Sequence, residues 1–273
     1  MNTAVVAGSL LFFLWTSGLA AAGQLLPEEV ARRAFWEDFL KTAKVVGAED
    51  IGEGVTKPKR LLLRKGEVEA RAVWKRPGGT DAGLFDKWEC EVAAYRMDKL
   101  VGLGFVPPTI ERRYRMYAGS LQLWIDLPKS EKEMAGELAA FTPDQDDHHR
   151  KIRAIQRAFD SLIGNSDRTL QNLRYTDDGR AILIDHSRAF RHTSPYGTGL
   201  LYGKNGFRTK DEFWPLPRPF VDKVRSLTFA AIRKAVEHYL TSSEIDAILA
   251  RRKLLLQELD ELIKEKGEGA VLY

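Results

Sequence analysis

The chain has 273 residues, of which 44% are apolar and 29% are charged, a composition typical of a globular protein with one large domain or two lobes. Its 42 basic and 38 acidic residues give a formal net charge of only +4, so the charge balance does not favour a nucleic-acid partner. The single cysteine, Cys90, excludes an intrachain disulfide and is expected to be a small core residue rather than a reactive thiol.

The N-terminal residues have the pattern of an export signal. Residues 1–27 contain no ionisable side chain, the run 4–15 is apolar, and Ala20 and Ala22 have the spacing of a signal-peptidase site. The run is shorter than the roughly 20 residues of a membrane-spanning helix. We therefore expect residues 1–22 to be a cleaved signal for the secretory pathway or another extracytoplasmic compartment. Because the segment has no Lys or Arg, an uncleaved anchor, with membrane association through the N-terminus, is the alternative.

Residues 23–45 are predicted to be mainly one helix, over 27–44. Pro27 suits the first helical turn, and Glu28 and Glu29 suit the positive end of the helix dipole.

Residues 46–127 are predicted to form a small lobe rich in strands. The expected elements are strands at 59–64 and 68–75, a Gly-rich loop, a helix at 84–101, and strands at 109–117 and 121–125 with a break at 118–120. On the expected helix, Glu91 lies on the apolar stripe that includes Trp88 and Tyr95. A carboxylate that faces a core usually needs a cationic partner, because burial of an unpaired charge is costly.

Residues 128–273 are predicted to form a larger, mainly helical lobe. One amphipathic helix ends at Gly164, the stretch 191–220 is irregular, and helices follow at 221–240 and 243–266, the last with a Ser243–Asp246 capping box. An irregular segment of this length is usually functional or mobile. A strand-rich lobe followed by a helical lobe predicts an α+β protein with a ligand-binding cleft between the lobes.

A hairpin is inserted in the helical lobe, in the stretch GNSDRTLQNLRYTDDGRAILIDHS. Alternating runs at 173–176 and 181–184 flank the turn signal DDGR. The start of the first strand of a hairpin lies beside the end of the second, so we expect Asn172 and Asp185 to be neighbours. Asp167 and Arg168 lie in the loop at the same end.

Oxygen-bearing side chains at this open end of the hairpin have two interpretations. Asn172 and Asp185 could hold Mg²⁺ or Mn²⁺, while Asp167 could orient a hydroxyl group or accept its proton. Alternatively, the hairpin is only a turn, and Asn165 and Asp167 cap the preceding helix.

The order of polar residues favours the first interpretation. Kinases use a strand lysine at the nucleotide phosphates, a helix glutamate that pairs with it, a catalytic aspartate, a metal-binding asparagine and a metal-binding aspartate. The chain offers these residues in the same order, as Lys75, Glu91, Asp167, Asn172 and Asp185.

Three stretches also carry a family resemblance. ECEVAAYRMDKLVGLGFVPPTIERR, AFDSLIGNSDRTLQN and ILIDHSRAF resemble the atypical secretory-pathway kinases, a family that includes the Golgi casein kinase, the xylosyl kinase of proteoglycan assembly and the four-jointed kinase. The D-R-x-x-x-N spacing is similar to that of the phosphatidylinositol 3- and 4-kinases. The resemblance covers about residues 46–190.

The resemblance implies a two-lobed kinase-like fold and the use of ATP with Mg²⁺ or Mn²⁺. It assigns Lys75 to the nucleotide phosphates, Glu91 to pairing with Lys75, Asp167 to catalysis, and Asn172 and Asp185 to the metal.

The same resemblance assigns Gly52 and Gly54 to nucleotide binding. The chain also departs from the family pattern: Thr169 replaces a histidine, the metal motif reads DHS, and the disulfides of the eukaryotic secreted members cannot form. The position of Asn172 often holds an acid in the casein-kinase branch.

Three functional hypotheses follow. The first is an ATP phosphotransferase whose partner is a hydroxyl-bearing acceptor on a protein, a sugar or a lipid headgroup. The second is an exported pseudokinase that acts as a binding or scaffolding module, and the third is an unrelated exported protein with two lobes. The sequence identifies neither the acceptor nor the oligomeric state.

Overall fold

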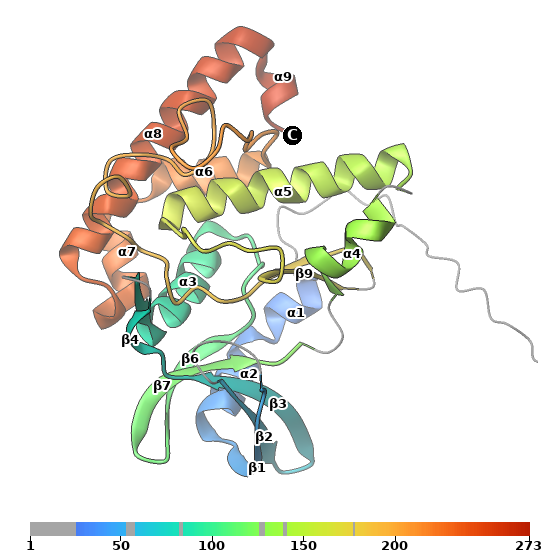
Figure 1. Cartoon of the computed structure of the whole chain (residues 1–273), viewed down its shortest axis with the longest axis vertical. Helices are drawn as coiled ribbons and strands as arrows, with labels where there is room; N and C mark the ends of the chain where they lie inside the picture. The colour runs from blue at the N-terminus through green and yellow to red at the C-terminus, as the bar shows by residue number, and fades with distance from the viewer. Residues whose placement is uncertain (1–25, 53–57, 82–83, 126–128, 139–140, 177) are drawn as a thin grey trace, which may run out of the picture.

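A computed structural model describes residues 26–52, 58–81, 84–125, 129–138, 141–176 and 178–273 (Figure 1). The predicted export signal and Gly54 lie outside the described residues. Among the helices in the described part of the chain, none combines the length and the apolar character needed to cross a membrane.

Strands dominate the first half of the chain and helices the second. The strands are β1 (Lys44–Asp50), β2 (Lys59–Lys65), β3 (Val68–Lys75), β4 (Gly78–Asp81), β5 (Leu84–Lys87), β6 (Thr109–Tyr114), β7 (Tyr117–Leu123), β8 (Lys129–Ser130), β9 (Leu173–Tyr175) and β10 (Ala181–Leu183). The helices are α1 (Pro27–Ala31), α2 (Arg33–Thr42), α3 (Trp88–Val101), α4 (Glu131–Leu138), α5 (Pro143–Ile163), α6 (Arg218–Ser226), α7 (Phe229–Val236), the 3₁₀ turn η1 (Glu237–Tyr239), α8 (Ser242–Lys266) and α9 (Glu268–Val271).

The N-terminal half is built on one antiparallel sheet with the strand order β1-β2-β3-β7-β6. Its inward side chains include Leu61, Leu63, Ala72 and Trp74, which pack with Phe39 of α2 into a separate apolar core. The expected alternation of β3 is therefore confirmed. It buries Ala72 and Trp74 on one face and leaves Lys75, at the end of the strand, on the other.

Helix α3 connects this sheet to the helical half of the molecule. Figure 1 shows it between the sheet at one end and α5, α6 and α8 at the other. Its buried residues Val92, Tyr95, Met97 and Val101 belong to the larger apolar core, which is formed mainly by the C-terminal helices. The architecture is the α+β arrangement of a strand-rich lobe and a helical lobe expected from the sequence.

The turn after α3 depends on Asp98. Its two carboxylate oxygens accept the backbone N–H groups of Gly104 at 3.1 Å and Phe105 at 2.8 Å, and Arg33 donates to the same group at 3.1 Å. Burial raises the pKa of Asp98 to about 6, although Arg33 and the backbone donors oppose this. Asp98 therefore fixes the direction in which the chain leaves α3, with Gly102 in the left-handed region at φ 74°.

Two expected elements were wrong in the N-terminal half. The segment 84–87 is the strand β5, paired with β4, and α3 begins only at Trp88. The expected break at 118–120 lies inside β7, and the hairpin turns at Arg115 and Met116 instead. Gly119 lies within β7, where a Cβ atom would be only 2.5 Å from the carbonyl oxygen of Lys75. The close approach of β7 to β3 therefore requires glycine at this position.

Helix boundaries also differ from expectation near both ends of the chain. The expected helix at 27–44 is divided into α1 and α2, and residues from Lys44 onward form β1. The expected helix at 221–240 is divided into α6, α7 and η1. The capping box of α8 is formed by Thr241 and Glu244, not by Ser243 and Asp246, because the threonine hydroxyl accepts the Glu244 N–H.

We predict that Asp98→Ala lowers the free energy of unfolding by about 3 kcal/mol, because two buried N–H groups and the Arg33 guanidinium lose their acceptor. Urea unfolding followed by circular dichroism measures the change. The matched control is Asp38→Ala, since Asp38 is exposed and pairs with Lys65 only at the surface. That variant should change the stability by less than about 1 kcal/mol. Equal effects of the two substitutions would contradict the role of Asp98.

Candidate active site

The amine of Lys75 lies between two carboxylates from distant parts of the sequence. Its Nζ atom is 2.8 Å from Oε1 of Glu91 and 3.0 Å from Oδ1 of Asp185. The side chain of Lys75 is only 13% exposed. Burial alone would lower the pKa of Lys75, but the charges of Asp185 and Glu91 outweigh it and raise the pKa above its ordinary value. The lysine is therefore charged and held in position.

Glu91 is the buried member of this group. It lies in the first turn of α3, and its second oxygen, Oε2, accepts the backbone N–H of His186 at 3.0 Å. Burial would raise the pKa of Glu91, but the charge of Lys75 and the nearby side chain of His186 hold it well below the ordinary value. The cationic partner expected for a carboxylate on the apolar stripe is thus Lys75.

Asp185 is the open member of the group. It follows β10 with φ 61°, a conformation uncommon for a residue with a Cβ atom. Its side chain is 37% exposed, and the hydroxyl of Ser187 lies 3.4 Å from Oδ1. The left-handed backbone directs a carboxylate to Lys75 while the next residue, His186, donates its N–H to Glu91.

The predicted catalytic aspartate stands on a loop that starts where α5 ends. Gly164 closes the helix with φ 63°, and the side-chain oxygen of Asn165 accepts the N–H of Asp167 at 3.3 Å. The Asp167 carboxylate is 35% exposed and lies 3.5 Å from the guanidinium of Arg188. Burial raises the pKa of Asp167, Arg188 opposes the shift, and nearby Asp185 adds to it.

The hairpin joins the loop of Asp167 to the segment of Asp185. Leu173 pairs with Leu183, and the N–H of Ile184 donates to the carbonyl of Asn172 at 3.1 Å. The backbone of Asn172 is thus bonded to the residue directly before Asp185, at the open end of the hairpin where the two were expected to be neighbours. The side-chain amide of Asn172 donates to the carbonyl of Asp167 at 3.3 Å.

The donor set contains oxygen atoms of the kind that a hard cation prefers. Asp185 offers an exposed carboxylate and Asn172 an amide oxygen, the ligand types that Mg²⁺ and Mn²⁺ accept. Within the described part of the chain, no group of three or more His, Cys, Asp or Glu residues could hold a metal by itself. Mg²⁺ in kinase-type sites usually has few protein ligands and completes its coordination with phosphate and water.

Sequence reasoning did not identify the acid that supports this loop. Asp160 of α5 is fully buried and accepts two hydrogen bonds from Arg168, at 2.9 Å and 3.0 Å. Burial would raise the pKa of Asp160, but Arg168 lowers it below the ordinary value. Arg168 also donates to the carbonyls of Asn172 and Ile184, each at 2.7 Å. The signal in the sequence was a carboxylate inside an otherwise apolar helix end.

A second unpredicted contact joins β5 to the Asp185 segment. Asp86 is buried and accepts hydrogen bonds from the Ser187 hydroxyl at 2.8 Å and from Arg188 at 3.0 Å and 3.1 Å. The N–H of Lys87 donates to the carbonyl of Ser187 at 2.9 Å. The strand before α3 is therefore attached to the residues that follow Asp185. No pattern in the sequence separates Asp86 from a solvent-exposed aspartate.

The remaining candidates lie apart from this arrangement or outside the described residues. Gly52 follows β1 with φ 74°, and within the described part of the chain no contact joins it to the Lys75 group; Gly54 lies outside the described residues. The adjacent histidines His148 and His149 lie on α5. Cys90 is buried, and burial raises the pKa of its thiol, which agrees with the expected core role.

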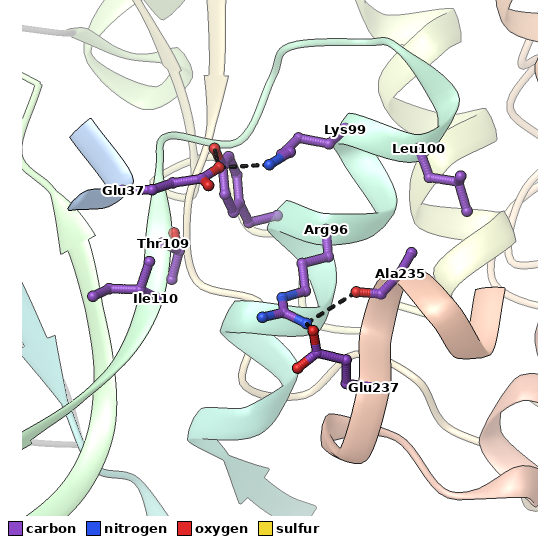
Figure 2. Close-up of a pocket in the computed structure, with 9 residues that line it drawn as sticks. Glu37, Arg96, Lys99, Leu100, Thr109, Ile110, Ala235 and Glu237 are labelled. Carbon is purple, nitrogen blue, oxygen red and sulfur yellow. Dashed lines mark hydrogen bonds and ion pairs between the residues drawn. The ribbon is translucent and has the colours of Figure 1, made fainter. Parts of the chain in front are cut away.

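A pocket open to solvent lies beside α3 and not at the Lys75 group. It has a volume of about 450 Å³ and a lining that includes Glu37, Arg96, Lys99 and Glu237. Figure 2 shows that its charged side chains are already paired, Lys99 with Glu37 at 2.5 Å and Arg96 with Glu237 at 3.0 Å. Because the titratable and polar groups of the kinase-like set converge elsewhere, the chemistry places the candidate active site at Lys75, Glu91 and Asp185.

Comparisons with known proteins agree with this geometry at the level of the fold. No protein-family model and no curated protein sequence matches the chain. The chain resembles a solved structure of the Golgi casein kinase, with a TM-score of 0.60 and 13% identity over 89% of this chain and 77% of that one. A second structure, of the Golgi casein kinase with Mn and ADP bound, gives a TM-score of 0.59 and 13% identity over 89% of this chain and 79% of that one.

At this identity the likeness concerns the fold alone. The chain therefore has a kinase-like α+β fold similar to that of the Golgi casein kinase.

Proposed function

We propose that this protein is a metal-dependent ATP phosphotransferase, an atypical kinase that phosphorylates a hydroxyl group. The observation that carries the proposal is the position of the Lys75 amine, 2.8 Å from Glu91 and 3.0 Å from Asp185. A strand lysine that meets a helix glutamate and a second acid after a hairpin is the arrangement kinases use for nucleotide phosphates. The kinase-like fold supports the same conclusion.

Each residue has a defined role in this proposal. Lys75 binds the nucleotide phosphates, and Glu91 keeps its ammonium group in position. Asp185 and Asn172 would hold Mg²⁺ or Mn²⁺, which when bound supplies charge neutralisation at the phosphates. Asp167 orients the acceptor hydroxyl and accepts its proton. The raised pKa of Asp167 increases its strength as a base relative to an ordinary aspartate.

The proposal also covers the family of the protein, its cellular location and the acceptor that it phosphorylates. The sequence resemblance and the fold both favour the atypical secretory-pathway kinases. The predicted signal at 1–22 favours a secretory or extracytoplasmic location, with retention as an N-terminal anchor as the alternative. The acceptor would be a protein side chain, a glycan or a lipid headgroup.

A pseudokinase is the second candidate function. Its specific support is the sequence around the site, where Thr169 replaces the usual histidine and His186-Ser187 follows Asp185. A pseudokinase would retain the kinase-like fold, with or without nucleotide binding. It would bind a partner but would not transfer phosphate.

We predict that Asp185→Ala weakens binding of a non-hydrolysable ATP analogue by at least about tenfold in Mg²⁺ or Mn²⁺ and removes most of the metal dependence, because it deletes a carboxylate ligand. Isothermal titration calorimetry with and without the metal measures both effects. The control is Asp222→Ala, an exposed aspartate of α6, which should bind as the unaltered protein does. Equal affinity of the two variants would refute the assigned metal site.

We further predict that Asp167→Ala lowers phosphate transfer by about 10²- to 10⁴-fold while leaving nucleotide affinity within about threefold, because Asp167 acts on the acceptor and not on the nucleotide. Transfer from radiolabelled ATP to the protein itself and to panels of proteins, glycans and lipids gives the rate. Transfer that depends on Asp167 excludes the pseudokinase. Metal-dependent nucleotide binding without any transfer in the unaltered protein favours it.

A further inference from the structure

Buried polar contacts connect the catalytic loop to α3, and His186 lies at their centre. Its side chain is 0% exposed. Nε2 of the ring is 3.0 Å from Nη2 of Arg168, in the loop beside Asp167. On the other side, the backbone N–H of His186 donates to Oε2 of Glu91 at 3.0 Å. His186 therefore contacts both Arg168, in the loop after α5, and Glu91, the partner of Lys75.

The chemistry of the two partners determines the form of the imidazole. A guanidinium can only donate hydrogen bonds, so Nε2 of His186 must be the acceptor and the proton of the neutral ring lies on Nδ1. Nδ1 is 3.7 Å from Oε2 of Glu91, just beyond hydrogen-bond range. A single oxygen of Glu91 is thus approached by the backbone N–H and by the ring N–H of the same residue.

Arg168 is itself firmly held. It makes paired hydrogen bonds to Asp160 at 2.9 Å and 3.0 Å, and it donates to the carbonyls of Asn172 and Ile184 at 2.7 Å. These bonds fix the guanidinium against both strands of the hairpin. Because Arg168 is fixed, its hydrogen bond to Nε2 also fixes the imidazole of His186.

We propose that His186 is a positioning residue that fixes Glu91, and through it Lys75, relative to the ion pair between Asp160 of α5 and Arg168 of the loop that carries Asp167. The proposal rests on the proposed function for its consequence at the nucleotide, and on the contacts above for its geometry. It gives a role to the histidine of the DHS motif, the position at which the sequence departs from the usual kinase metal motif.

An apolar residue of similar size would not reproduce this role. A phenyl ring would fill the volume, but it would leave a buried N–H of Arg168 without its acceptor and offer no donor to Glu91. Packing alone therefore predicts that His186→Phe is tolerated at the site, whereas positioning predicts that Glu91 and α3 become less ordered.

Hydrogen exchange of α3 amides, measured without nucleotide, is the first test. In His186→Phe we expect at least about tenfold faster exchange in the first turns of α3, and in His186→Gln we expect near-normal exchange, because the amide can accept from Arg168 and donate towards Glu91. His149→Phe is the matched control, since His149 lies on α5 beside Glu131 and Tyr175 and should leave α3 unchanged. Urea unfolding confirms that each variant is folded.

Affinity for a Mg²⁺-bound, non-hydrolysable ATP analogue is the second test. His186→Phe should weaken binding by about tenfold, and this loss should be much smaller when Glu91→Gln is already present, because His186 acts through Glu91. If His186→Phe does not fold, His186→Asn serves instead, since it is polar but too short to reach Arg168.

The outcomes separate the two proposals. A folded His186→Phe with unchanged α3 exchange overturns the positioning role, as does a loss of affinity that is undiminished by Glu91→Gln. Failure of the unaltered protein to bind the nucleotide overturns the proposed function, while the exchange of α3 still decides the role of His186.

Discussion

The ion cluster of Lys75, Glu91 and Asp185 is the constraint on which the rest of the structure depends. A buried glutamate is costly unless its charge is compensated and its oxygens are hydrogen-bonded. Here Oε1 faces Lys75 and Oε2 accepts the N–H of His186, so both oxygens are satisfied. The cluster requires the end of β3, the first turn of α3 and the residues after β10 to meet within hydrogen-bond distance, although they are far apart in the chain.

Different forces hold these three segments. β3 is a central strand, with β2 on one side and β7 on the other, and Gly119 allows β7 to approach Lys75 closely. α3 is anchored by its apolar residues in the larger core, and Asp98 fixes its end. The segment after β10 is held by polar contacts, with Asp86 on the side of β5 and Arg168 on the side of the loop that carries Asp167. Apolar burial therefore positions β3 and α3, and hydrogen bonds fix the segment after β10 against them.

The difference between apolar burial and polar contacts explains which elements could be predicted from the sequence. Alternation and amphipathic stripes predicted β3 and most of α3 and α5, since these elements bury apolar faces. The cost of a buried carboxylate predicted a cationic partner for Glu91, and the kinase-like order of residues together with the family resemblance pointed to Lys75 as that partner.

The supporting residues could not be predicted in the same way. Asp86 looks like an ordinary polar residue until the chain folds. Asp160 stands out as a carboxylate at an apolar helix end, but the sequence does not show that Arg168 is its partner, because in both cases the partner arginine comes from another element. The turn at Arg115 and Met116 was missed for a related reason. The Ala-Gly-Ser stretch at 118–120 has turn chemistry, but tertiary contact with β3 places it inside a strand.

One buried arginine, Arg251, helps to order the long irregular stretch that follows the candidate site, in a chain that cannot form a disulfide. Arg251 of α8 is fully buried and donates to the carbonyls of Leu162 at 3.0 Å, Arg191 at 2.7 Å and Tyr196 at 2.8 Å. Burial lowers its pKa only to about 10, so the guanidinium remains charged at neutral pH. A Cβ atom on Gly164 would lie 2.9 Å from the Cζ atom of Arg251. Gly164 is thus needed for two reasons, its left-handed backbone and the close approach of Arg251. The single side chain of Arg251 attaches the end of α5, where the Asp167 loop begins, to the irregular stretch.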